Sequence, residues 1–208
     1  MTAPRTRERI ATTALALFNR HGEPNVSTNG IADELGISPG NLHYHFRTKQ
    51  TLVDELFARF EQRLLDLLGG DAVEHADVDD AWLFLHLVFE AIADYRFLYR
   101  DLNELCGRSR DLRRRMRAIF KLSMRTAADL LDALNRAGRC EMAMLERDTV
   151  VRNIVLIASY WIAFDQIMER GEDPRPARAA IQVMSIVSPY LRGDARAQFE
   201  MLARAYRD

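Results

Sequence analysis

Hydrophobic residues recur at helical spacing along almost the whole chain. In the first segment, about residues 5–20, Ile10, Ala14, Leu17 and Phe18 follow one another at i, i+4, i+7 and i+8, which places them on one apolar stripe of a helix. No window shows the sustained alternation of apolar and polar residues that a half-buried strand requires. The pattern therefore predicts an all-α protein.

The second predicted helix is short and has clear end signals. Ser27 or Thr28 can cap its start, and Gly36 can end it, because glycine accepts the left-handed conformation found just past a helix. Its apolar positions are Ile31, Ala32 and Leu35.

A third short helix, about residues 39–46, follows the turn Leu35-Gly36-Ile37. Ser38 can cap it, and a proline at its first position needs no amide donor. Leu42 and Phe46 lie four residues apart and can face a core. Two short helices joined by such a turn are typical of a helix-turn-helix, in which the second helix enters the major groove of DNA.

A longer fourth helix connects this region to the rest of the chain. Thr48 can cap it, and leucine and phenylalanine recur at helical spacing up to Gly69-Gly70, a length of about 30 Å. After a polar loop, about 71–80, the pattern predicts helices at about 80–94, 96–106, 109–137, 145–170, 175–191 and 194–206. We therefore expect a three-helix DNA-binding domain over 1–50 and a helical body over 51–208, which the long fourth helix begins.

The third helix leaves polar and aromatic side chains with no place in a core. Gly40 near its start would let backbone approach a phosphate, and amides at a helix amino terminus favour an anion. Asn41 and His43 suit base edges. The candidate phosphate donors are Thr28, Ser38, Tyr44, His45 and Lys49.

The segment IADELGISPGNLHYHFRTK, residues 31–49, resembles the DNA-binding head of the tetracycline-repressor (TetR) family, as does ALALFNRHG at 14–22. The resemblance covers about the first 57 residues. It implies a homodimer with one head per subunit, a pseudo-palindromic operator and a divergent body that senses a small molecule. The positions that match the family's DNA contacts are Thr28, Ser38, Gly40, Asn41, His43, Tyr44, His45 and Lys49.

Two further features refine this resemblance. His43 occupies a position of the motif that is usually aromatic in the family. The base preference of this chain is therefore expected to differ from that of relatives with an aromatic residue there. The segment FLYRDLNEL, residues 97–105, resembles a subgroup whose bodies share this aromatic-RDLNEL stretch.

Aromatic residues of the body can either line a ligand cavity or fill a core. The candidate ligand-binding residues are Trp82, His86, Phe89, Tyr99, Phe120, Met124, Trp161 and Asp165. Glu90, Glu104 and Asp165 are expected near apolar neighbours, and a buried carboxylate needs a partner. That partner is either an arginine, such as Arg100 or Arg152, or a cationic ligand.

The segments 145–170 and 175–191 are apolar on nearly every side, so they predict a homodimer interface of four helices. The sequence has no run of about 18 apolar residues, which predicts no membrane contact. The amino terminus has charges where a signal peptide needs an apolar run, and a cytoplasmic location is expected.

Charge and chemistry favour a regulator over an enzyme. Residues 1–50 carry six basic against four acidic residues, whereas the whole chain has a net charge of −1. His43 and His45 point in different directions on a helix and cannot chelate one metal. We find no nucleophile–base pair, metal triad or phosphate loop, so we expect no catalytic residue, metal or cofactor. The alternatives are a helical enzyme using Asp165 or Glu90, and an interaction module whose head has lost DNA binding.

Arginines cluster between Arg108 and Arg117 and raise the question of a second nucleic-acid surface. Acidic residues lie nearby, and apolar residues keep helical spacing through the run. A solvated helix face is the favoured interpretation.

Overall fold

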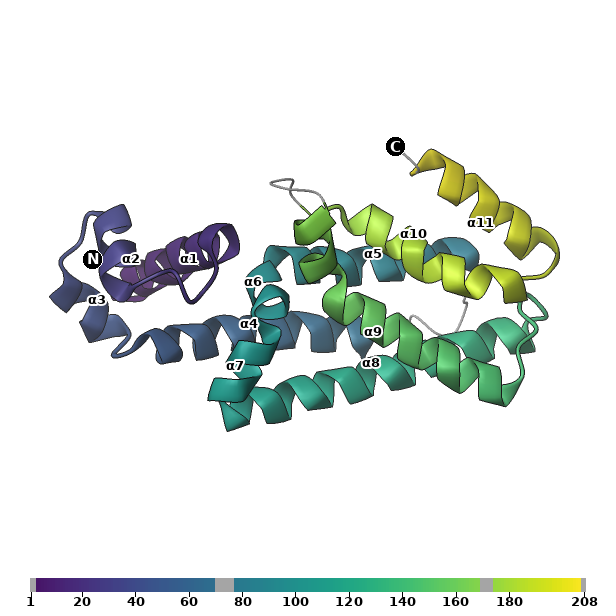
Figure 1. The fold of residues 1–208 in the computed structure, drawn as a ribbon, viewed down its shortest axis with the longest axis horizontal. Coiled ribbons are helices and arrows are strands. Elements are labelled where there is room, and N and C mark those ends of the chain that lie inside the picture. Colours follow the sequence, from purple (N-terminus) through teal and green to yellow (C-terminus); the bar gives the residue numbers. More distant parts are fainter. Residues whose placement is uncertain (1–2, 70–76, 169–173, 207–208) are drawn as a thin grey trace. The chain divides into compact units, whose positions relative to one another are not determined.

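The computed structural model describes residues 3–69, 77–168 and 174–206, and nearly all of these are helical (Figure 1). Within these ranges no strand occurs, and one isolated bridge joins Cys140 to Leu191. The predicted all-α class is confirmed. The helices are α1 (Ala3–His21), α2 (Thr28–Leu35), α3 (Pro39–His45), α4 (Lys49–Leu68), α5 (Val78–Asp94), α6 (Arg96–Arg100), α7 (Leu102–Arg108), α8 (Arg110–Arg136), α9 (Met144–Met168), α10 (Pro176–Val187) and α11 (Gly193–Ala205).

The predicted caps of the short helices are present. The Ser27 hydroxyl accepts a hydrogen bond from the amide of Gly30 at 3.0 Å, and the Ser38 hydroxyl accepts one from Asn41 at 3.2 Å. Gly36 ends α2 with a φ of 64°. These local signals set the ends of the two short helices.

The segment predicted as one helix over 96–106 is two helices, and this boundary was wrong. Asp101 separates α6 from α7 with φ −100° and ψ 19°. Its carboxylate accepts a hydrogen bond from the backbone N–H of Glu23 at 2.9 Å, a contact that apolar spacing alone does not reveal. This contact ties the junction of α6 and α7 to the turn that carries Glu23.

The predicted helix over 175–191 also ends earlier, at Val187, and a 3-10 turn follows over Ser188–Tyr190. Pro189 has no N–H to give the carbonyl of Ser185. The hydroxyl of Ser188 donates to that carbonyl at 3.0 Å instead. The proline thus sets the end of α10.

The chain divides into two compact units. The first contains Met1–Gln62 with Asp94–Arg114, and the second contains Arg63–Ala93 with Arg115–Asp208. The divisions fall within α4, at the last residue of α5 and within α8. The boundary predicted from the sequence, between a DNA-binding domain over 1–50 and a body over 51–208, divides the chain by function and not by compactness. It stays a prediction.

Aromatic packing forms the core of the first unit. Phe18 of α1 lies 5.2 Å from Phe97 of α6, between ring centroids. Phe60 of α4 lies 5.6 Å from Tyr95 and 5.7 Å from Tyr99. The α6 segment is therefore part of the scaffold on which the helix-turn-helix sits.

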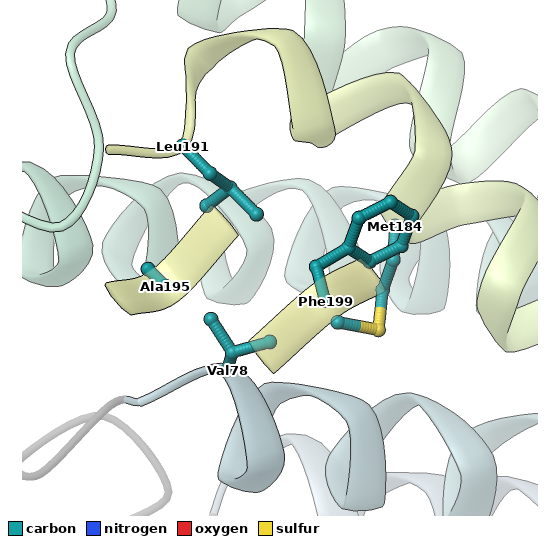
Figure 2. Packing of buried hydrophobic residues seen from close by; sticks show 5 residues of the cluster. All are labelled: Val78, Met184, Leu191, Ala195 and Phe199. Atoms are coloured by element: carbon teal, nitrogen blue, oxygen red, sulfur yellow. The ribbon is translucent and has the colours of Figure 1, made fainter. Parts of the chain in front are cut away.

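The second unit is a helical body with its own core. Figure 2 shows one buried cluster in which Val78 of α5 packs with Met184 of α10, Leu191, and Ala195 and Phe199 of α11. α9 packs against α10, as the figure of the whole fold also shows (Figure 1). The carboxyl-terminal helices thus complete this core.

Candidate nucleic-acid interface

The third helix, α3, has one buried apolar side and one exposed polar side, as its sequence pattern predicts. Leu42 is completely buried and Phe46 is 1% exposed, so both face the core of the head. Asn41, His43 and Tyr44 are exposed, and Tyr44 is 79% exposed. The helix therefore presents a polar and aromatic surface to solvent, in which the His43 ring lies 3.3 Å from the carbonyl of Arg47.

Contacts from α1 hold this helix in place. The Arg7 guanidinium lies 4.2 Å from the centroid of the Phe46 ring and donates to the carbonyl of His45 at 2.9 Å. The same guanidinium pairs with Glu55 of α4 at 2.8 Å. The end of α3 is therefore tied to both α1 and α4.

An open pocket of about 370 Å³ lies at the amino ends of α2 and α4. It brings together Thr28, His43 and Lys49, three predicted DNA contacts, with Thr48 beside them. Helix amino termini carry unpaired N–H groups and partial positive charge. With a lysine and a hydroxyl added, this pocket suits an anion such as a phosphate.

Gly40 is exposed at the start of α3, in the helix rather than at a positive φ. A Cβ atom built there would meet no other atom within 4 Å. Neither the backbone nor the packing of the chain itself requires glycine at this position.

Lys49 is more engaged with the protein than the sequence suggested. Its ammonium donates to the carbonyl of Glu23 at 2.9 Å and lies 3.1 Å from Oε1 of the same residue. The Lys49 side chain is 27% exposed, whereas that of Glu23 is fully buried. Arg108 supplies a second cation, 3.0 Å from Oε1 of Glu23.

Sequence reasoning missed Glu23 and Arg108. Glu23 follows Gly22 in a turn that looks solvated, and its partners come from α4 and α7. The expected positions of other carboxylates also need correction, because the side chains of Glu90 and Glu104 are 44% and 57% exposed. Glu90 pairs with His86 on its own helix at 3.4 Å, and Glu104 faces Arg108 at 3.9 Å.

The candidate ligand residues fall into separate groups. Trp82 stacks on His86 at 5.0 Å and on Tyr206 at 4.8 Å between centroids. Phe89 meets Trp161 edge to face at 5.5 Å. Tyr99 packs against Phe60 in the first unit, where burial raises the pKa of its hydroxyl. Phe120, Met124 and Asp165 are half-buried in the second unit.

Three buried nitrogens in this aromatic set have no hydrogen-bond partner among the described residues. They are Nε1 of Trp82, Nδ1 of His86 and Nε1 of Trp161. Buried polar atoms of this kind are uncommon in folded proteins and need a partner from elsewhere.

The arginine run at the start of α8 has the character of a solvated face. Arg113, Arg114 and Arg117 are exposed, and Arg114 pairs with Asp111 one turn away. This supports the interpretation that the sequence favoured for the run.

Comparison with known proteins gives consistent results along the whole chain. Residues 10–56 match the profile described as bacterial regulatory proteins, tetR family, and residues 59–199 match TetR, described as a bacterial transcriptional repressor. The chain belongs to the TetR family. This is a family of helix-turn-helix transcriptional regulators, and the predicted resemblance is confirmed, while the aromatic-RDLNEL subgroup stays a prediction.

The similarity of this TetR-family protein to individual relatives varies along its length. It is 46% identical over 50 residues to HTH-type transcriptional regulators of Staphylococcus aureus, a match that spans 27% of those relatives' length. A crystal structure of a TetR-family regulator from Marinobacter aquaeolei is 31% identical, with both chains fully covered and a TM-score of 0.88. A transcriptional regulator from Saccharomonospora viridis, crystallised with choline, has the same fold, with 17% identity, a TM-score of 0.71, and coverage of 91% of this chain and all of that one.

One helix of this TetR-family protein, α9, is long and apolar enough to span a membrane by length and composition alone. Only 28% of its most apolar window is buried within the described part of the chain. One such helix is weak evidence for a membrane span, because core helices of soluble proteins and signal sequences pass the same test.

Proposed function

We propose that this protein is a ligand-responsive transcriptional repressor that binds a pseudo-palindromic operator as a homodimer. The observation that carries the proposal is the exposed face of α3 beside the anion pocket. That face is polar and aromatic and lies next to two helix amino termini, and contacts from Arg7 hold the end of α3. A helix that contacts base edges in the major groove, beside residues that bind the DNA backbone phosphates, needs these features.

The residues divide into two roles in this proposal. Asn41 and His43 read base edges, since both are exposed on the surface of α3. Gly40 lets the DNA backbone come close to the amides at the start of α3. The residues that hold phosphates are Thr28, Ser38, Tyr44, His45 and Lys49.

The homodimer is proposed to form through α9 and α10, the helices expected at 145–170 and 175–191. In one chain α9 exposes Leu156, Tyr160, Phe164 and Ile167, which are 55%, 43%, 58% and 79% exposed. Their spacing places them along one side of the helix. A second subunit that covers this side would bury it and give the twofold symmetry that a palindromic operator needs.

The effector is proposed to bind among the aromatic residues of the body. The unpaired nitrogens of Trp82, His86 and Trp161 support this, because a bound molecule with acceptor atoms would satisfy them. The relative crystallised with choline supports the alternative of a cationic ligand, which aromatic faces also attract. Ligand binding would alter the separation or tilt of the two heads and so weaken operator binding. We propose a cytoplasmic, non-enzymatic protein.

Two substitutions test DNA binding and separate the two roles. Lys49→Ala should weaken binding to every duplex alike and lower the slope of log K against log salt by about one, because one phosphate contact is lost. Asn41→Ala should instead change the preference among duplexes selected from random sequence. Fluorescence anisotropy between 50 and 200 mM KCl measures both effects.

Asp33→Asn is a matched control, because Asp33 is exposed on α2 rather than on the reading helix. It should change neither the base preference nor, beyond the small effect of one charge, the affinity. If Asn41→Ala keeps both the affinity and the preference of the unsubstituted protein, Asn41 is not a reader. If the protein binds no duplex even at 50 mM KCl, the proposed function is wrong.

A further inference from the structure

Glu23 is a buried carboxylate between two cations of the same compact unit. Its Oε1 lies 3.1 Å from Nζ of Lys49 and 3.0 Å from Nη2 of Arg108. Neither cation is aligned for a hydrogen bond to the carboxylate, so both contacts are ionic. The directed hydrogen bond of Lys49 goes to the Glu23 carbonyl at 2.9 Å.

The charges of this group do not cancel. The buried carboxylate faces two cations, so these three side chains together carry a net charge of +1. Glu104 also lies 3.9 Å from Arg108, but its side chain is 57% exposed, so water screens this longer contact and it offsets little of that charge. A buried carboxylate holds its cations strongly because little water screens it. With Arg108 present, its positive potential offsets the negative potential of Glu23, so the positive potential of the Lys49 ammonium at the wall of the anion pocket is not cancelled. Without Arg108, Glu23 and Lys49 would neutralise each other.

Neighbouring contacts fix the turn that carries Glu23. The backbone N–H of Glu23 donates to Asp101 at 2.9 Å, and Arg100 donates to the carbonyl of Asn19 at 3.1 Å and to that of Phe18. The segment that supplies Arg108 thus also holds the backbone of Glu23. The distance between Arg108 and Glu23 is set by this local framework.

We propose that Arg108 is a positioning residue for DNA binding: it shares Glu23 with Lys49 and so leaves Lys49 able to hold a backbone phosphate. Arg108 does not line the pocket itself. Its effect passes through Glu23. This inference rests on the proposed function, since it concerns the phosphate contact of the same head.

The first test measures binding to a fluorescein-labelled 30-base-pair duplex of arbitrary sequence between 50 and 200 mM KCl. Arg108→Gln should weaken binding about three- to tenfold and lower the salt slope by about one, the effect of one lost phosphate contact. Arg108→Lys should restore most of the loss, because an ionic contact needs the charge and not the guanidinium geometry. In a Lys49→Ala background, Arg108→Gln should have no further effect, because it acts only through Lys49.

Arg110→Gln is the matched control. Arg110 is exposed two residues further along and carries the same charge. Its loss should change affinity less than twofold. If Arg110→Gln weakens binding as much as Arg108→Gln, the effect is one of general charge and the proposal is wrong. The proposal is equally overturned if Arg108→Gln binds like the unsubstituted protein, or if its loss adds in full to that of Lys49→Ala.

A second test needs no DNA. The chain has two lysines, Lys49 and Lys121, so the acetylation rate of each can be followed by peptide mass spectrometry, with exposed Lys121 as the internal reference. Arg108→Gln should slow acetylation of Lys49 relative to Lys121, because a fully paired ammonium reacts more slowly. Unfolding of the variant would speed it instead. For a variant whose circular dichroism spectrum and melting temperature show that it is folded, an unchanged or faster ratio overturns the proposal.

The two tests also separate failure of this inference from failure of the proposed function. If the unsubstituted protein binds no duplex, the function is wrong, and the acetylation ratio still decides whether Arg108 shares Glu23. If the unsubstituted protein binds DNA but the ratio does not fall in Arg108→Gln, only the role of Arg108 is wrong.

Discussion

At the scale of single residues, a substitution at Gly40 should have opposite effects on the stability of the fold and on DNA affinity. Nothing in the chain lies within 4 Å of a Cβ atom at this position, and the backbone is helical. Gly40→Ala should therefore keep or raise the free energy of unfolding, by about 0.5 kcal/mol, because alanine favours a helix. DNA affinity should fall at least fivefold, because the new methyl group would meet the DNA backbone. Urea denaturation and anisotropy measure the two effects.

Gly107 provides the control for this substitution, because it is also helical and exposed, and a Cβ there meets nothing within 4 Å. Gly107→Ala should stabilise the chain without changing DNA affinity. Undiminished DNA binding by Gly40→Ala would show that no backbone approaches that position.

The same scale shows what sequence can and cannot reveal about the site. Leu42 and Phe46 were predictable as core residues because their spacing along one helix decides their burial. Glu23 was not, because its burial depends on Lys49 and Arg108, which lie on other helices. Contacts between distant segments leave no periodic signal in one sequence.

At the scale of elements, ion pairs join α1 to α4. Arg59 pairs with Glu8 through both oxygens at 2.7 Å, and Glu55 pairs with Arg7 at 2.8 Å and with Arg59 at 3.1 Å. Hydrogen bonding from Arg59 lowers the pKa of Glu8, and hydrogen bonding from Arg7 lowers that of Glu55. These contacts brace the two helices that flank the reading helix.

The lowered pKa values predict acid sensitivity of the head. Folded Glu8 and Glu55 bind protons less readily than in the unfolded chain, so their contribution is complete above the ordinary carboxyl pKa of 4.5. It disappears as the pH falls through the lowered values. The double variant Glu8→Gln with Glu55→Gln should lose about 1 kcal/mol at pH 7, since both sites are partly exposed, and less at pH 3 than at pH 7. Thermal melts across this range measure the difference.

Glu34→Gln is the control for the acid effect, because Glu34 is an exposed carboxylate on α2. Its melting temperature should follow that of the unsubstituted protein at every pH. If the double variant loses as much stability at pH 3 as at pH 7, the ion pairs are not the source of the acid sensitivity.

Element boundaries were predictable wherever the signal was local. Ser27, Ser38 and Gly36 act within their own helices, and the structure places helix ends there. The break at Asp101 was not predictable, because no local signal marks it and its side chain contacts the distant backbone of Glu23. The order and approximate length of the helices thus follow from the sequence, whereas the interruption that positions Arg108 does not.

At the scale of the whole molecule, the exposed apolar side of α9 predicts how subunits assemble. The unsubstituted protein should sediment at twice the 23.9 kDa mass of the chain. Leu156→Glu with Phe164→Glu should shift it to a monomer at micromolar concentration, because association would bury two unpaired carboxylates. Sedimentation velocity measures the masses.

Met201→Glu tests whether any exposed apolar residue would give the same result, because Met201 lies on α11 and is 64% exposed. It should remain a dimer.

The monomeric α9 variant should also bind a palindromic duplex about as weakly as it binds a single half-site, since a dimer engages two half-sites spaced about 34–36 Å apart and a monomer only one. A monomer with undiminished affinity for the palindrome would show that the heads act independently, and a double variant that stays dimeric would place the subunit interface elsewhere than α9.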